Sequence, residues 1–284
     1  MKNNNYSNVT SDDDNSDATY PYFVEPYFIY VITCVIISIG LPLTLVAIYS
    51  LYSQVQNNNV APIFIINLLI SDIIQFCCMI VKKARPDWKN DEIFYYIYCF
   101  GVLASIGFMV CVALERYLVI AWPLWYRFRR TIKISLAVCV VVWTLPLVYV
   151  LPFYFQVEIK VLKTISSVCF LVPFPLLIFF LGGTLKSLSA AISVSSDEKR
   201  RIVGILVLVL LIYTLLFLPK IIWNLVEEAR DNYTFDNLTF ILLRFSPLAD
   251  LILYVFMRKG AIDKLLASLC CCRMDSDDNS RSSA

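Results

Sequence analysis

Two adjacent charges stand at the end of a long uncharged stretch of the chain. Residues 93–114 contain no Lys, Arg, Asp or Glu, and Glu115, Arg116 and Tyr117 follow directly. Ionisable groups at the edge of an apolar helix are costly to remove from water, so they are functional candidates. Neighbouring residues do not share a helix face, so Glu115 can hold Arg116 only loosely. A loosely held arginine can swing between two partners, and this pattern indicates a switch.

Other charges interrupt apolar stretches. Asp72 is the single charge of its stretch before Lys82 and Lys83, and Lys220 and Arg244 lie inside later stretches. A cation without a partner is expensive there, which favours a carboxylate or phosphate ligand clamped by Lys220 and Arg244. Lys82 and Lys83 have an alternative explanation, because lysines at a helix end can extend to the membrane surface. Alternative counter-charges are Glu25, Glu227 and Glu228.

These residues must be positioned by membrane helices. Hydrophobic residues make up 59% of the 284-residue chain, more than a soluble domain carries, and they recur in runs of helix-spanning length. The composition predicts an all-α membrane protein, a seven-transmembrane helix bundle with a short amphipathic eighth helix. Residues 1–25 are predicted as a disordered extracellular tail, 26–269 as the membrane domain and 270–284 as a cytoplasmic tail. The predicted spans are 26–52, 62–82, 93–122, 134–155, 166–188, 199–226 and 235–256, with a surface helix at 258–269.

Glycosylation signals give the topology. Asn-x-Ser/Thr sites occur in the N-terminal tail and between the sixth and seventh spans, at Asn5, Asn8, Asn232 and Asn237. Seven spans place both regions on one face, and glycosylation requires the extracellular one. Asn237 lies close to the membrane. The sequence therefore predicts a multi-pass plasma-membrane protein with an extracellular N-terminus.

Composition and motifs exclude several function classes. The basic residues are not clustered as in a nucleic-acid interface. The chain has no histidine and no Cys-x-x-Cys pair, so no metal site is expected. Catalytic motifs are absent, which argues against an enzyme, and there are no internal repeats of the kind that transporters show. A channel would need a polar stripe repeated across helices.

The ordered motifs resemble those of rhodopsin-like (class A) G-protein-coupled receptors over essentially all of residues 26–269. The resemblance is nearest to the branch of lysolipid, nucleotide, hydroxycarboxylic-acid and proton-sensing receptors. Proton sensing by histidine is excluded because the chain has none, and proton sensing by buried acids is kept as a secondary alternative. The matching residues are Gly40 and Thr44 on the first span, Asn67 to Asp72 on the second, Ser105, Glu115-Arg116-Tyr117 and Pro123-Leu124 on the third, Trp143, Tyr213-x-x-x-Phe217-x-Pro219, and Asp250 to Tyr254.

The resemblance implies a role for each matching group. The G-protein switch would comprise Glu115, Arg116, Tyr117, Leu124 and Tyr254. A hydrated polar core, which a sodium ion could occupy, would comprise Asp72, Ser105, Ser246 and Asp250. A toggle and hinge would comprise Tyr213, Phe217 and Pro219. The ligand site would lie among the outer halves of the helices, at Lys82, Lys83, Tyr95, Tyr98, Lys220 and Arg244. No other cofactor is implied. The partners would be a heterotrimeric G protein, arrestin, receptor kinases, membrane lipid and an anionic small-molecule or lipid ligand.

Departures from the family pattern carry their own expectations. Lys199 stands where many relatives have an acid that restrains Arg116, so basal activity is expected to be high unless Asp197 or Glu198 substitutes. Asp91 occupies the usual disulfide position, which leaves Cys99 and Cys169 as the candidate pair. Cys270, Cys271 and Cys272 are typical of juxtamembrane palmitoylation. The alternative function is a divergent seven-helix protein that binds a ligand or partner without activating a G protein.

Overall fold

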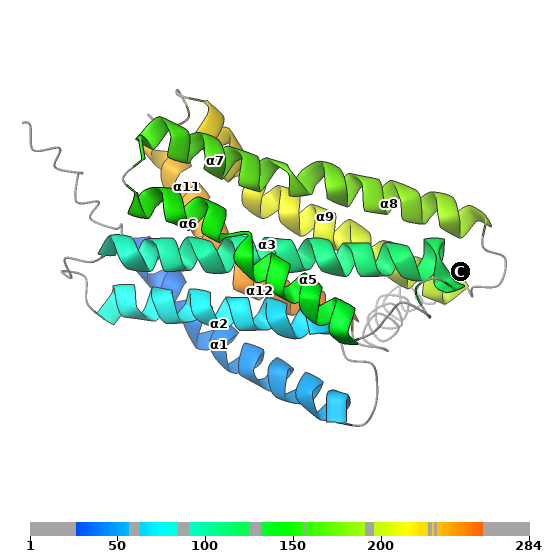
Figure 1. The fold of residues 1–284 in the computed structure, drawn as a ribbon. Helices are drawn as coiled ribbons and strands as arrows, with labels where there is room; N and C mark the ends of the chain where they lie inside the picture. Colours follow the sequence, from blue (N-terminus) through cyan, green and yellow to red (C-terminus); the bar gives the residue numbers. More distant parts are fainter. Residues whose placement is uncertain are drawn as a thin grey trace, which may run out of the picture.

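The fold consists of long α-helices that lie side by side (Figure 1). The structure is a computed structural model, and it describes residues 27–56, 63–84, 91–124, 126, 132–155, 157–190, 196–226, 229 and 232–257. The helices are α1 (Tyr27–Gln56), α2 (Ile63–Ala84), α3 (Asp91–Ala121), α5 (Ile132–Thr144), α6 (Leu147–Tyr154), α7 (Ile159–Leu171), α8 (Pro173–Ala190), α9 (Ser196–Leu225), α11 (Tyr233–Arg244) and α12 (Ser246–Met257).

Within this described part of the chain, 6 stretches are long and apolar enough to cross a membrane. The bent pair of α11 and α12 makes a seventh. The predicted seven-transmembrane bundle is therefore confirmed. The predicted tails, the surface helix at 258–269 and the palmitoylation sites Cys270, Cys271 and Cys272 lie outside the described residues.

Three of the predicted continuous spans are interrupted, and each interruption lies at a proline. The fourth span breaks between α5 and α6 at Pro146, and the fifth breaks between α7 and α8 just before Pro173. Proline has no N–H to donate and its ring clashes with the preceding turn, so the helix cannot continue unchanged. The seventh span bends by 41° between α11 and α12, where Pro247 follows. The fifth span also begins earlier than predicted, at Ile159.

Helix α3 is the centre of the bundle. It contacts α2 and α8 most extensively and also reaches α5, α6 and α9. Figure 1 shows it running through the middle of the molecule, with α2 on one side and α8 on the other. Several of its side chains are fully buried, including Ala104, Phe108 and Val112. By contrast, α1 and α5 contain many exposed apolar side chains, as expected for helices that face lipid.

A polar contact joins α2 to α5 inside this bundle. The indole Nε1 of Trp143 donates a hydrogen bond to Asn67 Oδ1 at 2.9 Å. Asn67 Nδ2 in turn donates to the carbonyl oxygen of Ile63 at 2.9 Å and lies 3.5 Å from Cys139 Sγ. Trp143 also stacks on Phe100 and meets the edge of Phe108 on α3. The single tryptophan of the fourth span therefore ties three helices together.

The candidate disulfide between Cys99 and Cys169 does not form. Both thiols are free. Cys99 lies on α3 beside the hydroxyl groups of Tyr95 and Tyr149, whereas Cys169 lies on α7 near Tyr213. The two thiols thus have different neighbours and are not bonded to each other, so the sequence-based candidate pair is wrong.

Candidate functional site

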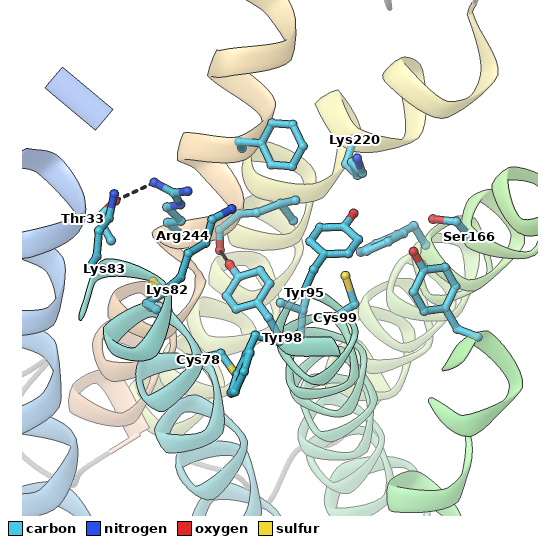
Figure 2. Close-up of a pocket in the computed structure, with 17 residues that line it drawn as sticks. Thr33, Cys78, Lys82, Lys83, Tyr95, Tyr98, Cys99, Ser166, Lys220 and Arg244 are labelled. Atoms are coloured by element: carbon cyan, nitrogen blue, oxygen red, sulfur yellow. Dashed lines mark hydrogen bonds between the residues drawn. The ribbon is translucent and has the colours of Figure 1, made fainter. Parts of the chain in front are cut away.

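A cavity opens among the helices at the end of the bundle away from Glu115 and Arg116. Its empty volume is about 790 Å³, and residues of α1, α2, α3, α6, α7, α9 and α11 line it. All of the side chains that we predicted for ligand binding line this one cavity: Lys82, Lys83, Tyr95, Tyr98, Lys220 and Arg244. Figure 2 shows them converging from helices that are far apart in the sequence.

Arg244 is held in place by the first helix. Its Nη1 donates a hydrogen bond to Thr33 Oγ1 at 2.7 Å, and Thr33 Oγ1 donates to the carbonyl oxygen of Ile29 at 2.7 Å. Thr33 is almost fully buried, with 1% of its surface exposed. This chain of hydrogen bonds orients the guanidinium toward the cavity. Nearby, Lys83 Nζ lies 4.6 Å from the ring centroid of Tyr30.

Tyr98 satisfies a backbone acceptor created by the bend of the seventh span. Its hydroxyl donates to the carbonyl oxygen of Leu243 at 2.9 Å. In a regular helix that carbonyl would accept from the residue four positions later, which is Pro247 and has no N–H. The tyrosine of α3 therefore replaces the helical hydrogen bond that the proline removes. It also fixes the backbone next to Arg244.

Lys220 is the most deeply buried cation of the cavity, with 4% of its surface exposed. Its Nζ lies 3.6 Å from the ring centroid of Trp223 and 5.1 Å from that of Phe240. Both distances are typical of cation–π contacts. One turn beyond Lys220, Asn224 Nδ2 donates to Ser166 Oγ at 3.1 Å, which links α9 to α7 beside the cavity.

Several lining residues were not predicted from the sequence, among them Thr33, Tyr149, Ser166, Phe170 and Phe240. Helical spacing could have identified one of them, because Phe240 lies four residues before Arg244 and therefore on the same helix face. No comparable signal marks Tyr149, because α6 contains no charged residue. Ser166 follows Lys163 by three residues on α7, so a charge lies near it, although that charge did not enter the prediction.

The predicted polar core also comes together, at the middle of the bundle. Ser105 Oγ donates to Asp250 Oδ2 at 2.7 Å, and Gln75 Nε2 donates to Asp72 Oδ1 at 3.3 Å. Asp72, Ser105, Ser246 and Asp250 all have 0% of their surface exposed. Gln75 was not predicted, although it lies three residues after Asp72 and shares its helix face.

The donor set of this core fits a hard cation. Within the described chain, buried oxygen atoms of Asp72, Asp250, Ser246, Thr44 and Gln75 have no hydrogen-bond partner. Carboxylate, hydroxyl and amide oxygens are the ligands that hard cations prefer. The described residues contain no cluster of three or more His, Cys, Asp or Glu that could hold a metal ion, so hydroxyl and amide oxygens would have to complete any coordination here. The arrangement can therefore hold a monovalent cation or water.

At the opposite end of the bundle, the switch residues lie around the end of α3. Glu115 is 6% exposed, and its Oε1 accepts a hydrogen bond from the hydroxyl of Tyr126 at 2.7 Å. The sequence-based reading paired Glu115 with Arg116 and did not include Tyr126. Leu124 is 74% exposed and Tyr254 of α12 is 8% exposed. An exposed leucine beside the switch is available to a partner protein.

Tyr117 packs onto the glycine-rich part of α8. Its ring centroid lies 5.9 Å from that of Phe179 and 5.8 Å from that of Phe180. A Cβ atom on Gly183 would come within 2.7 Å of the Tyr117 ring. Gly183 therefore makes room for this aromatic ring, whereas a Cβ atom on Gly182 would meet nothing within 4 Å.

The predicted toggle residues are central to the core. Tyr213 and Phe217 both have 0% of their surface exposed, and their ring centroids are 5.1 Å apart. The Tyr213 hydroxyl donates to the carbonyl oxygen of Phe170, close to the break between α7 and α8. Phe217 stacks on the Phe170 ring, with centroids 5.8 Å apart. Pro219 follows within α9.

Helices α9 and α12 are joined near the switch by a contact that the sequence did not suggest. Arg201 Nη2 donates to the carbonyl oxygen of Met257, the last residue of α12. A cation at a helix C-terminus is stabilised by the exposed carbonyl groups and the helix dipole. Lys199 was expected to mark a missing restraint on Arg116, and the contact of Arg201 is a different one, which joins α9 to α12. The side chains of Asp197 and Glu198 lie outside the described part.

Comparison with known proteins supports the receptor family that the sequence motifs indicate. Residues 43–169 match the 7 transmembrane receptor (rhodopsin family). G-protein coupled receptor 68 of Homo sapiens is 22% identical over 289 residues, which cover 88% of this chain and 79% of that receptor. The chain is therefore similar to rhodopsin-like seven-transmembrane receptors over most of its length.

Two further proteins to which this chain is similar are also receptors. Proteinase-activated receptor 1 of Xenopus laevis is 23% identical over 284 residues, covering 87% of this chain and 67% of the relative. Mas-related G-protein coupled receptor member X1 of Homo sapiens is 29% identical over 121 residues, covering 41% of this chain and 37% of the relative. The predictions of a rhodopsin-like receptor rather than an enzyme, and of a multi-pass membrane protein, are confirmed.

The receptor's predicted glycosylation sites differ in exposure. Asn232 is exposed at the start of α11, where its Oδ1 accepts from Thr234 N at 3.1 Å and Phe235 N at 3.2 Å. Asn237 is 9% exposed and buried against the bundle. Of these two, Asn232 presents its amide to solvent. Asn5 and Asn8 lie outside the described residues.

Proposed function

We propose that this receptor detects an extracellular, anionic small molecule and activates a heterotrimeric G protein. The ligand would carry a carboxylate or phosphate, alone or on a lipid. The observation that carries the proposal is the gathering of four basic side chains around one aromatic-lined cavity: Lys82, Lys83, Lys220 and Arg244. Charge-assisted hydrogen bonds from such groups are among the strongest that a protein can offer an acid.

The same end of the molecule supports an orientation for the receptor. Asn232 lies just before α11, whose last residue Arg244 borders the cavity. A glycan at Asn232 would place the cavity end outside the cell and Glu115 and Arg116 in the cytoplasm. The receptor would then stand in the plasma membrane with its N-terminus extracellular.

The cytoplasmic end would act as the switch. Glu115 is engaged by Tyr126, and Arg201 holds the end of α12, so α9 and α12 are tied together where a partner would dock. Ligand binding would release Arg116 and let Tyr254 move toward it, and a helix of the G protein would bind beside Arg116 and Leu124. Receptor kinases and arrestin would act on the same face.

The polar core would couple the two ends. Asp72 and Asp250 are buried in one cluster with oxygen atoms that lack partners. A sodium ion bound there would neutralise part of their charge. Ser105, Ser246 and Thr44 would orient and solvate this cluster. Its disruption would change the packing of α2, α3 and α12, the helices that contribute most of these residues.

The test uses the full-length receptor in cells that report G-protein dissociation. A panel of fatty acids, short carboxylic acids, lysophospholipids and nucleotides is applied, and we expect at least one acid to release the G protein. Arg244→Ala and Lys220→Ala are expected to weaken that response about tenfold or more, as loss of charge-assisted hydrogen bonds predicts. An unchanged response in both variants would refute the anionic site.

A second variant separates G-protein activation from ligand binding. Arg116→Glu reverses the charge of the switch far from the cavity. We expect it to abolish nucleotide exchange while leaving the affinity for the same acid unchanged. If wild-type receptor binds the acid and never promotes nucleotide exchange, the alternative of a receptor-like binding protein is correct.

A further inference from the structure

The cavity contains two separate basic groups. The first, the Arg244 group, comprises Arg244 with Lys82 and Lys83 and lies where α11 and α2 meet α1. The second, the Lys220 group, comprises Lys220 with the rings of Trp223 and Phe240. Figure 2 shows the Arg244 group on one side of the cavity, next to Thr33, and Lys220 on the other side, toward Ser166.

The wall between the two groups is formed by consecutive residues of α3. Tyr98 lies beside Arg244, because its hydroxyl binds the carbonyl oxygen of Leu243 at 2.9 Å. Cys99 lies on the Lys220 side, within electrostatic reach of that ammonium. Successive residues of a helix point in different directions, so α3 presents one face to each group. Each group therefore meets the cavity from its own side of α3.

The Lys220 group is built to receive an anion of its own. Lys220 is 4% exposed and lines the cavity, on the side near Ser166 (Figure 2). In the described chain its contacts are the rings of Trp223 and Phe240, at 3.6 and 5.1 Å, and no carboxylate forms an ion pair with it. Cation–π contacts offset only part of the desolvation of a buried ammonium.

Asp236 is the acid that acts on Lys220 from the neighbouring helix. It is 7% exposed in the first turn of α11, and its Oδ1 has no hydrogen-bond partner among the described residues. It attracts the Lys220 ammonium without forming a salt bridge among the described residues. Lys220 is thus buried at the edge of the cavity with a neighbouring acid that does not pair with it.

We propose that the ligand carries two acidic groups joined by an apolar segment, with one acid at the Arg244 group and the other at the Lys220 group. This inference rests on the proposed function and names its ligand class. The hydrogen bond to Thr33 fixes the guanidinium plane, which suits a bidentate carboxylate or phosphate. Between the two ends, the apolar segment would contact the lining side chains Val102, Phe170 and Leu243.

The test measures binding to purified full-length receptor by isothermal titration calorimetry. The probes are a length series of straight-chain α,ω-dicarboxylates, the monocarboxylates of the same lengths, and ω-phosphonocarboxylates. At the matching length we expect the dicarboxylate to bind about tenfold or more tightly than its monocarboxylate, because it makes a second charge-assisted contact. The phosphonocarboxylates show which acid each end prefers.

Variants then assign each acid to its group. Lys220→Gln is expected to reduce the dicarboxylate to the affinity of the monocarboxylate, whereas the matched control Lys220→Arg keeps the charge and the preference. Arg244→Gln is expected to weaken both probes. Thermal unfolding of each variant without probe shows that it is folded.

Two outcomes would overturn the inference. If monocarboxylates bind and dicarboxylates of every length bind no better, the second acidic group is excluded while the anionic site stands. If Lys220→Gln leaves the dicarboxylate preference intact, then Lys220 serves an internal role with Asp236 instead. Failure of every acid to bind would refute the proposed function itself.

Discussion

Replacing Tyr98 by Phe tests how the receptor tolerates the proline bend beside its cavity. The variant removes the hydroxyl that donates to the carbonyl oxygen of Leu243 at 2.9 Å. Leu243 is 6% exposed, so its carbonyl loses the side-chain donor in a mostly buried place. An unsatisfied buried acceptor costs about 1–3 kcal/mol. On the scale of soluble domains, that lowers the Tm by about 2–6 °C.

A second substitution identifies the cause. Pro247→Ala restores a backbone N–H four residues after Leu243, and that N–H can replace the lost hydroxyl. In the Pro247→Ala background we therefore expect Tyr98→Phe to cost about 0.5 kcal/mol or less, with a coupling free energy of about 1 kcal/mol between the two sites.

The assay is thermal unfolding of the purified receptor in one detergent, with all four members of the cycle measured together. Tyr27→Phe is the matched control, because Tyr27 is 82% exposed and should show no change. An equal loss of stability in both backgrounds would refute the claim that Tyr98 compensates for the proline. No loss in either background would mean that the carbonyl has another donor.

Three further predictions concern the switch and the polar core. Gly183→Ala should lower the Tm, because its Cβ would approach the Tyr117 ring to 2.7 Å. Gly182→Ala should raise the Tm, because alanine is favoured over glycine in a helix by about 0.5–1 kcal/mol. Equal effects of the two substitutions would refute the packing argument. Arg201→Ala removes a hydrogen bond that ties α9 to α12, and such a bond is worth about 1 kcal/mol. GTPγS binding without ligand should therefore rise about threefold to tenfold at equal surface expression. Unchanged basal binding would contradict this role. Asp250→Asn should abolish any rise of the Tm with sodium over potassium, and a sodium effect that survives would place the cation elsewhere.

The chemistry of the site could be predicted from the sequence because charges inside apolar helices are conspicuous. Lys220 and Arg244 were expected to share a site, and both line the cavity. Asp72 and Asp250 were expected in one polar core, and both are fully buried there.

The partners of these groups could not be predicted. Arg244 binds Thr33 of the first helix, and Glu115 accepts from Tyr126 beyond the end of α3. Both contacts depend on how the helices are rotated about their axes. The disulfide candidate failed for the same reason, because a count of cysteines says nothing about the direction in which Cys99 and Cys169 point.

By itself, the sequence determined that lipid surrounds most of the chain, where the helical spans lie, and which side chains are chemically unusual. Apolar length sets the spans, and the cost of charge in lipid marks the residues. Tertiary structure alone decided which face of each helix turns inward. On α9, Leu211 and Leu215 are 61% and 67% exposed while Tyr213 and Leu216 are 0% and 4% exposed, yet all four are largely apolar side chains. In lipid the outer face is as apolar as the inner one, so hydrophobic periodicity does not fix the rotation of a helix. Packing and the few buried hydrogen bonds fix it instead.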